Sequence, residues 1–165
     1  MKLRVLAIVL LAMLLAGCGF RPAGTLDVAN LEDMYVLDAT ALGSSGMAWQ
    51  VQQEMKLRGV PAAARSDDRR VLRILGEDWD RRPLSLTADA RTAEYELIGS
   101  VEFELLGSDG RVLIPARTIT ADAVLRRDSQ RLLGSSQEES RLREELRQEL
   151  ARRVLSASSA VGRRR

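Results

Sequence analysis

The amino-acid sequence predicts an α+β fold, a two-layer sandwich in which two helices pack on one face of a four-stranded mixed sheet. The clearest evidence is the segment TAEYELIGSVEFEL at 92–105, where apolar and polar residues alternate as in a strand with one buried face. The turn sequence GSDG follows at 107–110 and predicts a hairpin. Apolar residues then recur every four positions between 142 and 154, which predicts an amphipathic helix.

The first half of the chain is expected to form a strand, a helix and a second strand. The segment MYVLDA at 34–39 is typical of a short strand. A helix over 46–58 is predicted by apolar residues at helical spacing, with the GSSG serines at 43–46 as caps and Gly59 as its stop. The second strand covers 71–79, and Pro83 is expected to end it. Strands joined through a helix in this way should be parallel.

The second half is expected to form a hairpin and a long helix. On the strand at 92–105, Glu94, Glu96, Glu102 and Glu104 share the face opposite the apolar residues. The returning strand covers 111–126 and should bulge or bend at Pro115. A capping box at Ser135 or Ser136 should open the last helix. The predicted order is therefore β-α-β-β-β-α, in one domain over 31–156 with a flexible tail at 157–165.

Composition excludes several classes of function. The chain of 165 residues contains no histidine, so Ser–His triads and histidine metal sites are excluded. Motifs for phosphate loops, zinc proteases and serine hydrolases are absent as well. We therefore predict no enzyme, no catalytic residues, no metal and no cofactor. Outside the leader, basic and acidic residues are equal in number, which argues against nucleic acid as a partner.

The N-terminal segment has the features of an export signal. Lys2 and Arg4 precede an apolar run over 5–16, which is shorter than the roughly 20 residues of a membrane-spanning helix. The sequence Leu15-Ala16-Gly17-Cys18 resembles the lipobox of bacterial lipoproteins. This resemblance implies removal of residues 1–17, lipidation of Cys18 and a lipidated tether over 18–30. The alternative is an ordinary secretory signal that leaves Cys18 as a thiol.

Three features together resemble one family. These are the lipobox, the order of the elements, and the segment TAEYEL at 92–97 followed by a hairpin containing Gly110, Leu113 and Pro115. The chain resembles the LptE (RlpB) family of lipopolysaccharide-assembly lipoproteins. The resemblance implies a protein anchored on the periplasmic side of the cell outer membrane. Such a protein plugs and helps assemble the LptD β-barrel, and it binds lipopolysaccharide during transport to the cell surface.

The acidic stripe on the strand at 92–105 is compatible with this role, because large outer-membrane barrels have polar interiors. A stripe that simply faces water is the alternative.

A candidate lipopolysaccharide site follows from the hairpin geometry. In an antiparallel hairpin the loops near 80–91 and 126–135 share one end of the sheet. Guanidinium groups bind phosphate in a bidentate manner. The candidate residues are Arg81, Arg82, Arg91, Arg126, Arg127 and Arg131. The alternative is a rim of surface arginines paired with nearby aspartates. The turn at 133–136 ends without a lysine or arginine, which departs from what such a site could use.

Two other functions remain open at this stage. A lipoprotein that carries or chaperones lipids or other envelope components would need an enclosed apolar cavity, and the chain has few aromatic residues to line one. An envelope hydrolase that uses only carboxylates would need a pair of acids in a cleft.

The arginine prediction can be tested by charge reversal. Replacing Arg91 and Arg127 together by Glu should weaken lipopolysaccharide binding while leaving association with LptD intact, because only the phosphate contacts are reversed. Binding would be measured on the purified double variant. An unchanged affinity for the glycolipid would reject these two residues as part of the site.

Overall fold

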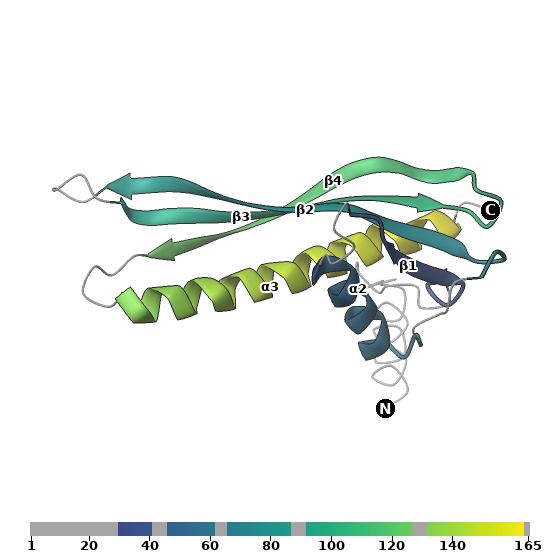
Figure 1. The fold of residues 1–165 in the computed structure, drawn as a ribbon, viewed down its shortest axis with the longest axis horizontal. Helices are drawn as coiled ribbons and strands as arrows, with labels where there is room; N and C mark the ends of the chain where they lie inside the picture. The colour runs from purple at the N-terminus through teal and green to yellow at the C-terminus, as the bar shows by residue number, and fades with distance from the viewer. Residues whose placement is uncertain (1–29, 41–45, 62–65, 87–91, 127–131, 164–165) are drawn as a thin grey trace, which may run out of the picture.

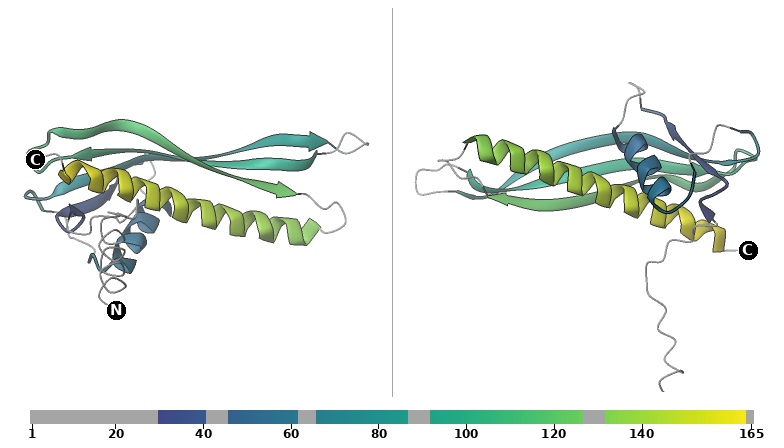
Figure 2. Two further views of the ribbon diagram at one scale, coloured as in Figure 1. Left: turned by 180° about the vertical axis from the view of Figure 1, so that it is seen from behind. Right: turned by 90° about the horizontal axis from the view of Figure 1, so that it is seen from below.

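A computed structural model describes residues 30–40, 46–61, 66–86, 92–126 and 132–163. The elements are β1 (Met34–Asp38), α2 (Gly46–Leu57), β2 (Arg70–Leu86), β3 (Thr92–Leu106), β4 (Val112–Arg126), α3 (Leu132–Ser159) and the short 3₁₀ helix η2 (Ala160–Arg163). The sheet order is β1-β2-β3-β4, with β1 parallel to β2 and the other neighbours antiparallel. Both helices lie on one face of the sheet (Figure 1, Figure 2). The predicted fold class and element order are confirmed, whereas Cys18 and the tether up to residue 29 lie outside the described residues.

The molecule is elongated because its strands differ greatly in length. The short strand β1 pairs only with residues 70–74 of β2, whereas β2, β3 and β4 run on together far beyond it (Figure 1). We call the part that contains β1 and α2 the proximal half. The distal half is the remainder, in which α3 alone lies beneath the three long strands. The tip is the far end of the distal half, where β2 ends, β3 begins and β4 ends.

The apolar core lies mainly in the proximal half. The inward face of β3 is buried from Leu97 to Leu105, as its alternation predicts, and each large apolar side chain removed from water contributes about 1.5–3 kcal/mol. α2 and α3 each add an apolar stripe to the same core. The fully buried apolar residues of these three elements are Met47, Val51, Leu97, Val101, Phe103, Leu105, Leu150, Ala151, Val154 and Leu155.

Both ends of α2 are satisfied by specific contacts. At its C-terminal end Gly59 has a φ of 78°, its N–H bonds the Lys56 carbonyl, and the Val60 N–H bonds the Met55 carbonyl. These are the two bonds of a Schellman motif, so the predicted glycine stop is confirmed. At the other end the Met47 N–H donates to the Glu77 carboxylate at 3.1 Å. Since serines 44 and 45 lie outside the described residues, their predicted capping stays a prediction.

The hairpin between β3 and β4 follows the prediction. Gly107 and Arg111 close the turn through a backbone bond of 2.8 Å, and Gly110 adopts a φ of 77°. The pairing partner shifts from Arg117 to Ile114 as β3 passes from Phe103 to Leu105. β4 therefore carries an extra residue at this point, which confirms the predicted bulge at Pro115.

The predicted end of the second strand at Pro83 is wrong. β2 continues through Pro83, which pairs with Tyr95 of β3, to Leu86. Proline lacks only the N–H that would join a neighbouring strand, so an edge strand tolerates it. Because β1 ends early, β2 is an edge strand throughout the distal half. A register shift between Pro83 and Ser85 accompanies the proline.

The C-terminal segment is also more ordered than the expected tail from residue 157. α3 continues to Ser159, and η2 follows it. Ser158 is fully buried and donates to the Val154 carbonyl at 2.8 Å. The Asn30 side chain donates to the Ser159 carbonyl at 3.1 Å. The serine hydroxyls bond the backbone of their own helix, and Asn30, at the start of the described residues, holds the end of α3.

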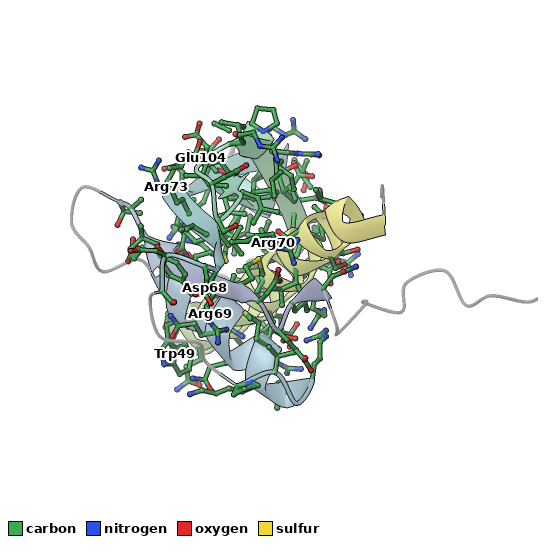
Figure 3. All side chains as sticks on the ribbon, turned by 90° about the vertical axis from the view of Figure 1, so that its right-hand side faces the viewer. Trp49, Asp68, Arg69, Arg70, Arg73 and Glu104 are labelled. Carbon is green, nitrogen blue, oxygen red and sulfur yellow. The ribbon has the colours of Figure 1, made fainter. Side chains whose placement is uncertain are left out.

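Arginines at the start of β2 hold the turn that precedes β1. The Arg70 guanidinium contacts the Asp33 carboxylate at 2.5 Å, and Arg69 donates to the Glu32 carbonyl at 2.8 Å. Figure 3 views this proximal end, with Arg73 and Glu104 on one side of the molecule and Trp49 on the other. The exposed Trp49 lies on the outer side of α2, with 59% of its surface accessible.

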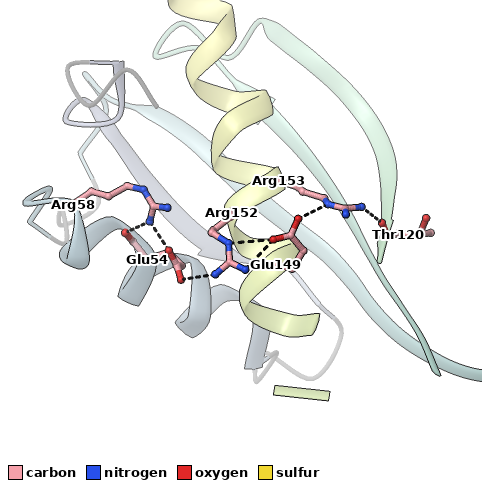
Figure 4. Close-up of polar contacts among 6 residues, drawn as sticks. All are labelled: Glu54, Arg58, Thr120, Glu149, Arg152 and Arg153. Atoms are coloured by element: carbon pink, nitrogen blue, oxygen red, sulfur yellow. Dashed lines mark hydrogen bonds and ion pairs between the residues drawn. The ribbon is translucent and has the colours of Figure 1, made fainter. Parts of the chain in front are cut away.

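A chain of charged groups links α2, α3 and the edge of β4 (Figure 4). Its members are Glu54, Arg58, Thr120, Glu149, Arg152 and Arg153. Arg152 approaches the buried Glu54 of α2 at 3.8 Å and Glu149 at 2.8 Å. Arg153 contacts Glu149 at 2.8 Å and donates to the Thr120 backbone carbonyl at 2.7 Å. The hydrogen bonds from Arg153 and Arg152 lower the pKa of Glu149.

Gly99 on β3 provides space for the ring of Trp79 on β2. A Cβ at Gly99 would lie 2.7 Å from the Trp79 ring and 3.1 Å from Leu150 of α3. The absence of a side chain therefore allows the indole to cross β3 beneath α3.

We predict that Gly99→Ala lowers the free energy of unfolding by about 1–3 kcal/mol, the usual cost of inserting atoms into a packed site. The matched control is Gly76→Ala, where the new Cβ would lie 4.0 Å from Glu102 and should cost little. Urea unfolding of both variants makes the comparison. Equal stabilities of the two variants would contradict the packing of Trp79 on Gly99.

A second prediction concerns acid. Because its pKa is below the ordinary value of 4.5, ionised Glu149 contributes stability above pH 4.5, and this contribution is lost as pH falls through the lowered pKa. Glu149→Gln should therefore flatten the decrease in stability between about pH 5 and pH 3. The effect should be at most about 1 kcal/mol, since the pair is partly exposed. The exposed Glu138, changed to Gln, is the control. A Glu149→Gln profile that overlays the wild type would refute the link.

Candidate functional site

The tip brings together the two segments that were predicted to share one end of the sheet. Arg82 lies opposite Glu96, and Arg126 lies opposite Glu94. Both arginines are on the outer face, away from the helices. Arg81, the neighbour of Arg82, points to the opposite face because side chains alternate along a strand. The other three predicted residues, Arg91, Arg127 and Arg131, lie outside the described residues.

Cross-strand ion pairs hold three arginines against the acidic stripe on the outer face of the sheet. The Arg82–Glu96 pair has an N···O distance of 2.5 Å, and the Arg126–Glu94 pair has one of 2.8 Å. Farther along β3, Arg73 and Glu104 pair at 2.5 Å. Three of the four predicted glutamates of the stripe thus have an arginine on the adjacent strand. The partners of these described arginines are glutamates, and Asp89 and Asp128, two of the aspartates considered from the sequence, lie outside the described residues.

On the helix-facing side the tip carries a polar layer centred on Glu139 of α3. Its Oε1 atom accepts hydrogen bonds from Arg81 of β2 and from Arg143 of α3, the latter at 3.2 Å. The Oε2 atom accepts the Tyr95 hydroxyl at 2.7 Å. The carboxylate is mostly buried, with 16% of its side chain exposed. Glu139 therefore joins β2, β3 and α3 without an apolar contact.

A second carboxylate, Glu77 of β2, lies where this polar layer meets the core. Its Oε1 atom accepts the indole N–H of Trp79 and the Nε–H of Arg147, both at 2.9 Å. The guanidinium carbons of Arg143 and Arg147 lie 5.2 Å and 5.5 Å from the centroid of the Trp79 ring. The ring orients both guanidinium groups through cation–π attraction.

These residues border a cleft of about 340 Å³ between the distal part of β2 and α3. The lining residues are Arg81, Ser136, Glu139, Ser140, Arg143 and Arg147. All six are polar or charged, although their carbon atoms supply about half of the surface that faces the cleft. The guanidinium groups among them suit contact with an anion.

The charged residues of the last helix do not by themselves indicate this cleft, because their composition is that of an ordinary solvated helix surface. Arg147 is in fact 24% exposed and bonds Glu77 across the two layers. One signal was available: Glu139, Arg143 and Arg147 recur every four residues and therefore lie on one face of the helix.

No group of three or more histidine, cysteine or acidic side chains among the described residues could hold a metal ion. None of the helices described has the length and apolarity needed to cross a membrane.

Comparisons with known proteins agree with this geometry. Residues 30–158 match the family model LptE, described as lipopolysaccharide-assembly. The chain is 29% identical over 159 residues to the LPS-assembly lipoprotein LptE of Photorhabdus laumondii. The aligned region covers 94% of this chain and 85% of the relative.

Solved structures share the fold. Rare lipoprotein B from Shewanella oneidensis superposes with a TM-score of 0.66 at 24% identity, over 78% of this chain and 96% of that one. An uncharacterized lipoprotein B from Nitrosomonas europaea gives a TM-score of 0.66 at 17% identity, over 87% of this chain and 92% of the other. Because the family model spans nearly all of the described domain, the chain belongs to the LptE family of lipopolysaccharide-assembly proteins.

Proposed function

We propose that this chain is an outer-membrane lipoprotein, anchored through Cys18, that plugs and helps assemble the LptD β-barrel and binds lipopolysaccharide on its way to the cell surface. Membership of the LptE family supports a role in lipopolysaccharide assembly in the cell envelope. The leader sequence and its lipobox-like end support the anchor.

The observation that carries the plug assignment is the outer face of the sheet. None of the described helices covers this face (Figure 1), and yet it is not apolar. Three of its four glutamates are paired with arginines of adjacent strands, as at Arg82–Glu96 and Arg73–Glu104. The exposed Asp78, Asp80 and Asp122 lie on the same face. This surface is therefore polar and acidic, which suits the polar interior of a large barrel. An exposed apolar sheet face would instead favour a lipid carrier.

Lipopolysaccharide binding is supported by the guanidinium groups at the tip. Arg82 and Arg126 occupy the outer face, and Arg81 faces the cleft. Each group can form paired hydrogen bonds to a phosphate. The polar lining of the cleft gives no support to the alternative of a lipid carrier, which would need an enclosed apolar cavity.

The proposal can be tested by purifying the tagged full-length chain from outer-membrane extract in detergent. We expect the LptD barrel to co-purify in equal amount and the chain to carry acyl mass at Cys18. A photo-crosslinking residue in place of Val124, which is on the outer face and 54% exposed, should join the chain to the barrel on irradiation.

The control carries the crosslinking residue in place of Val101, which is fully buried, and should give no such adduct if it folds. Acylated chain that purifies without any barrel would contradict the plug assignment. Chain that lacks acyl mass would contradict the anchor.

A further inference from the structure

We infer that the outer side of α2 is a membrane-contact surface, where Trp49 and Leu57 meet the phospholipid surface that holds the acylated Cys18. The inference rests on the lipid anchor of the proposed function, and it adds a second point of contact on the folded domain itself. This surface belongs to the proximal half and is separate from the arginines and the cleft at the tip.

α2 exposes two large apolar side chains that take no part in the core. Trp49 has 59% and Leu57 has 79% of its surface accessible, whereas Met47, Val51 and Met55 of the same helix are buried. Trp49 and Leu57 are eight residues apart, which is about 12 Å along a helix, and both lie on the side that faces away from the core. The helix therefore has one apolar stripe for the core and a separate apolar pair directed at solvent.

The residue types on this side suit a membrane interface. Tryptophan combines an apolar ring with an N–H that can stay hydrated, and it is enriched where membranes meet water. The exposed Lys56 lies next to Leu57, and a lysine can reach lipid phosphates while its methylene groups rest on apolar surface. The one carboxylate of α2, Glu54, is buried and paired with Arg58. No acidic group on the outer side of α2 therefore opposes an anionic lipid.

The tether enters the domain close to α2. The Asn30 side chain donates to the Ser159 carbonyl at the end of α3, and both helices lie in the same layer (Figure 2). Arg152 of α3, which is 3.8 Å from Glu54 of α2, precedes Ser159 by seven residues, or about 10 Å along the helix. Glu139 at the tip precedes Ser159 by twenty residues, or about 30 Å. The anchored end of the chain is thus much nearer to α2 than to the tip.

The length of the tether makes a weak contact effective. Cys18 and Asn30 are twelve residues apart, and a chain of that length spans at most about 40 Å. Acyl chains in the membrane therefore keep α2 near its surface, so the contact becomes intramolecular and has a high effective concentration. Two side chains that could not recruit a free protein can then orient one that is already anchored.

The charge of the opposite side of the molecule supports the same orientation. The outer face of the sheet, which the helices do not cover (Figure 2), carries the exposed Asp78, Asp80 and Asp122. Carboxylates are repelled by a surface of anionic phospholipids. Contact through α2 turns this acidic face away from the lipid and leaves it available to the proposed barrel partner.

The test uses the fluorescence of Trp49 in the full-length acylated chain, bound to vesicles of phosphatidylethanolamine and phosphatidylglycerol. Bromine atoms placed near the headgroup end of the lipid acyl chains quench an indole at the interface. Since Trp79 is the only other tryptophan, the Trp49→Phe variant supplies the signal to be subtracted. Leu57→Ser removes the second contact. The matched control is Val124→Ser, which removes an exposed apolar side chain from the outer face of the sheet.

We expect brominated vesicles to quench the wild type clearly and Trp49→Phe much less. Leu57→Ser should weaken the contact roughly tenfold and so reduce the quenching of Trp49, because removing one large apolar side chain from water contributes at least that factor. Val124→Ser should behave as the wild type does. Thermal unfolding checks that each variant is folded, and flotation checks that it is anchored.

Equal quenching of the wild type and Trp49→Phe would overturn the inference. A loss of quenching in Val124→Ser as large as that in Leu57→Ser would overturn it too, because the contact would then not be specific to α2.

The remaining outcomes separate this inference from the proposed function. An acylated chain that floats with the vesicles while Trp49 stays unquenched would overturn the membrane contact, leave the anchor in place and favour a protein as the partner of α2. A chain without acyl mass would overturn the anchor and this inference together. Quenching of Trp49 in an acylated chain that co-purifies with no barrel would support the contact and contradict the plug assignment.

Discussion

The carboxylate of Glu77 lies where the apolar core ends and the polar layer of the distal half begins. It accepts hydrogen bonds from the Met47 N–H at the start of α2, from the indole of Trp79 and from the guanidinium of Arg147. A buried carboxylate is costly unless its hydrogen bonds are satisfied, and here three separate elements satisfy it. Because the same group fixes the start of α2 and the position of α3, the cleft depends on it although it does not line the cleft.

The long strands explain why such contacts are needed. The long strands extend beyond α2, so in the distal half only α3 covers the inner face of the sheet. One helix cannot cover the whole width of that face with an apolar core. In the distal half the space between α3 and the sheet is filled partly by apolar residues such as Leu97 and Leu125. Charged groups around Glu139 and the Trp79 ring above Gly99 fill the rest. Stacked guanidinium groups supply contact area there while keeping donors exposed to solvent. α3 and the sheet are thus held together at the tip while the surface of the tip stays polar.

Local patterns predicted much of this structure, and long-range pairing set the rest. The alternation at 92–105 predicted which face of β3 is buried, and Gly59 predicted the end of α2. The strand through Pro83 was not predicted because tolerance of proline depends on where β1 ends. The ion pairs of the acidic stripe required the register of β2 against β3, which no local pattern specifies. The cleft was missed for the same reason, since Arg81 and Arg143 are far apart in sequence.

The two edges of the sheet affect how other β-strands can pair with this protein. Unpaired strand edges invite other strands to add to them. On β2, Pro83 has no N–H to donate to a further strand, and on β4 the guanidinium of Arg153 occupies the Thr120 carbonyl. A protein with such edges can contact unpaired β-strands of a partner through its side chains without forming backbone hydrogen bonds to them. Its sheet edges therefore disfavour the addition of a further strand.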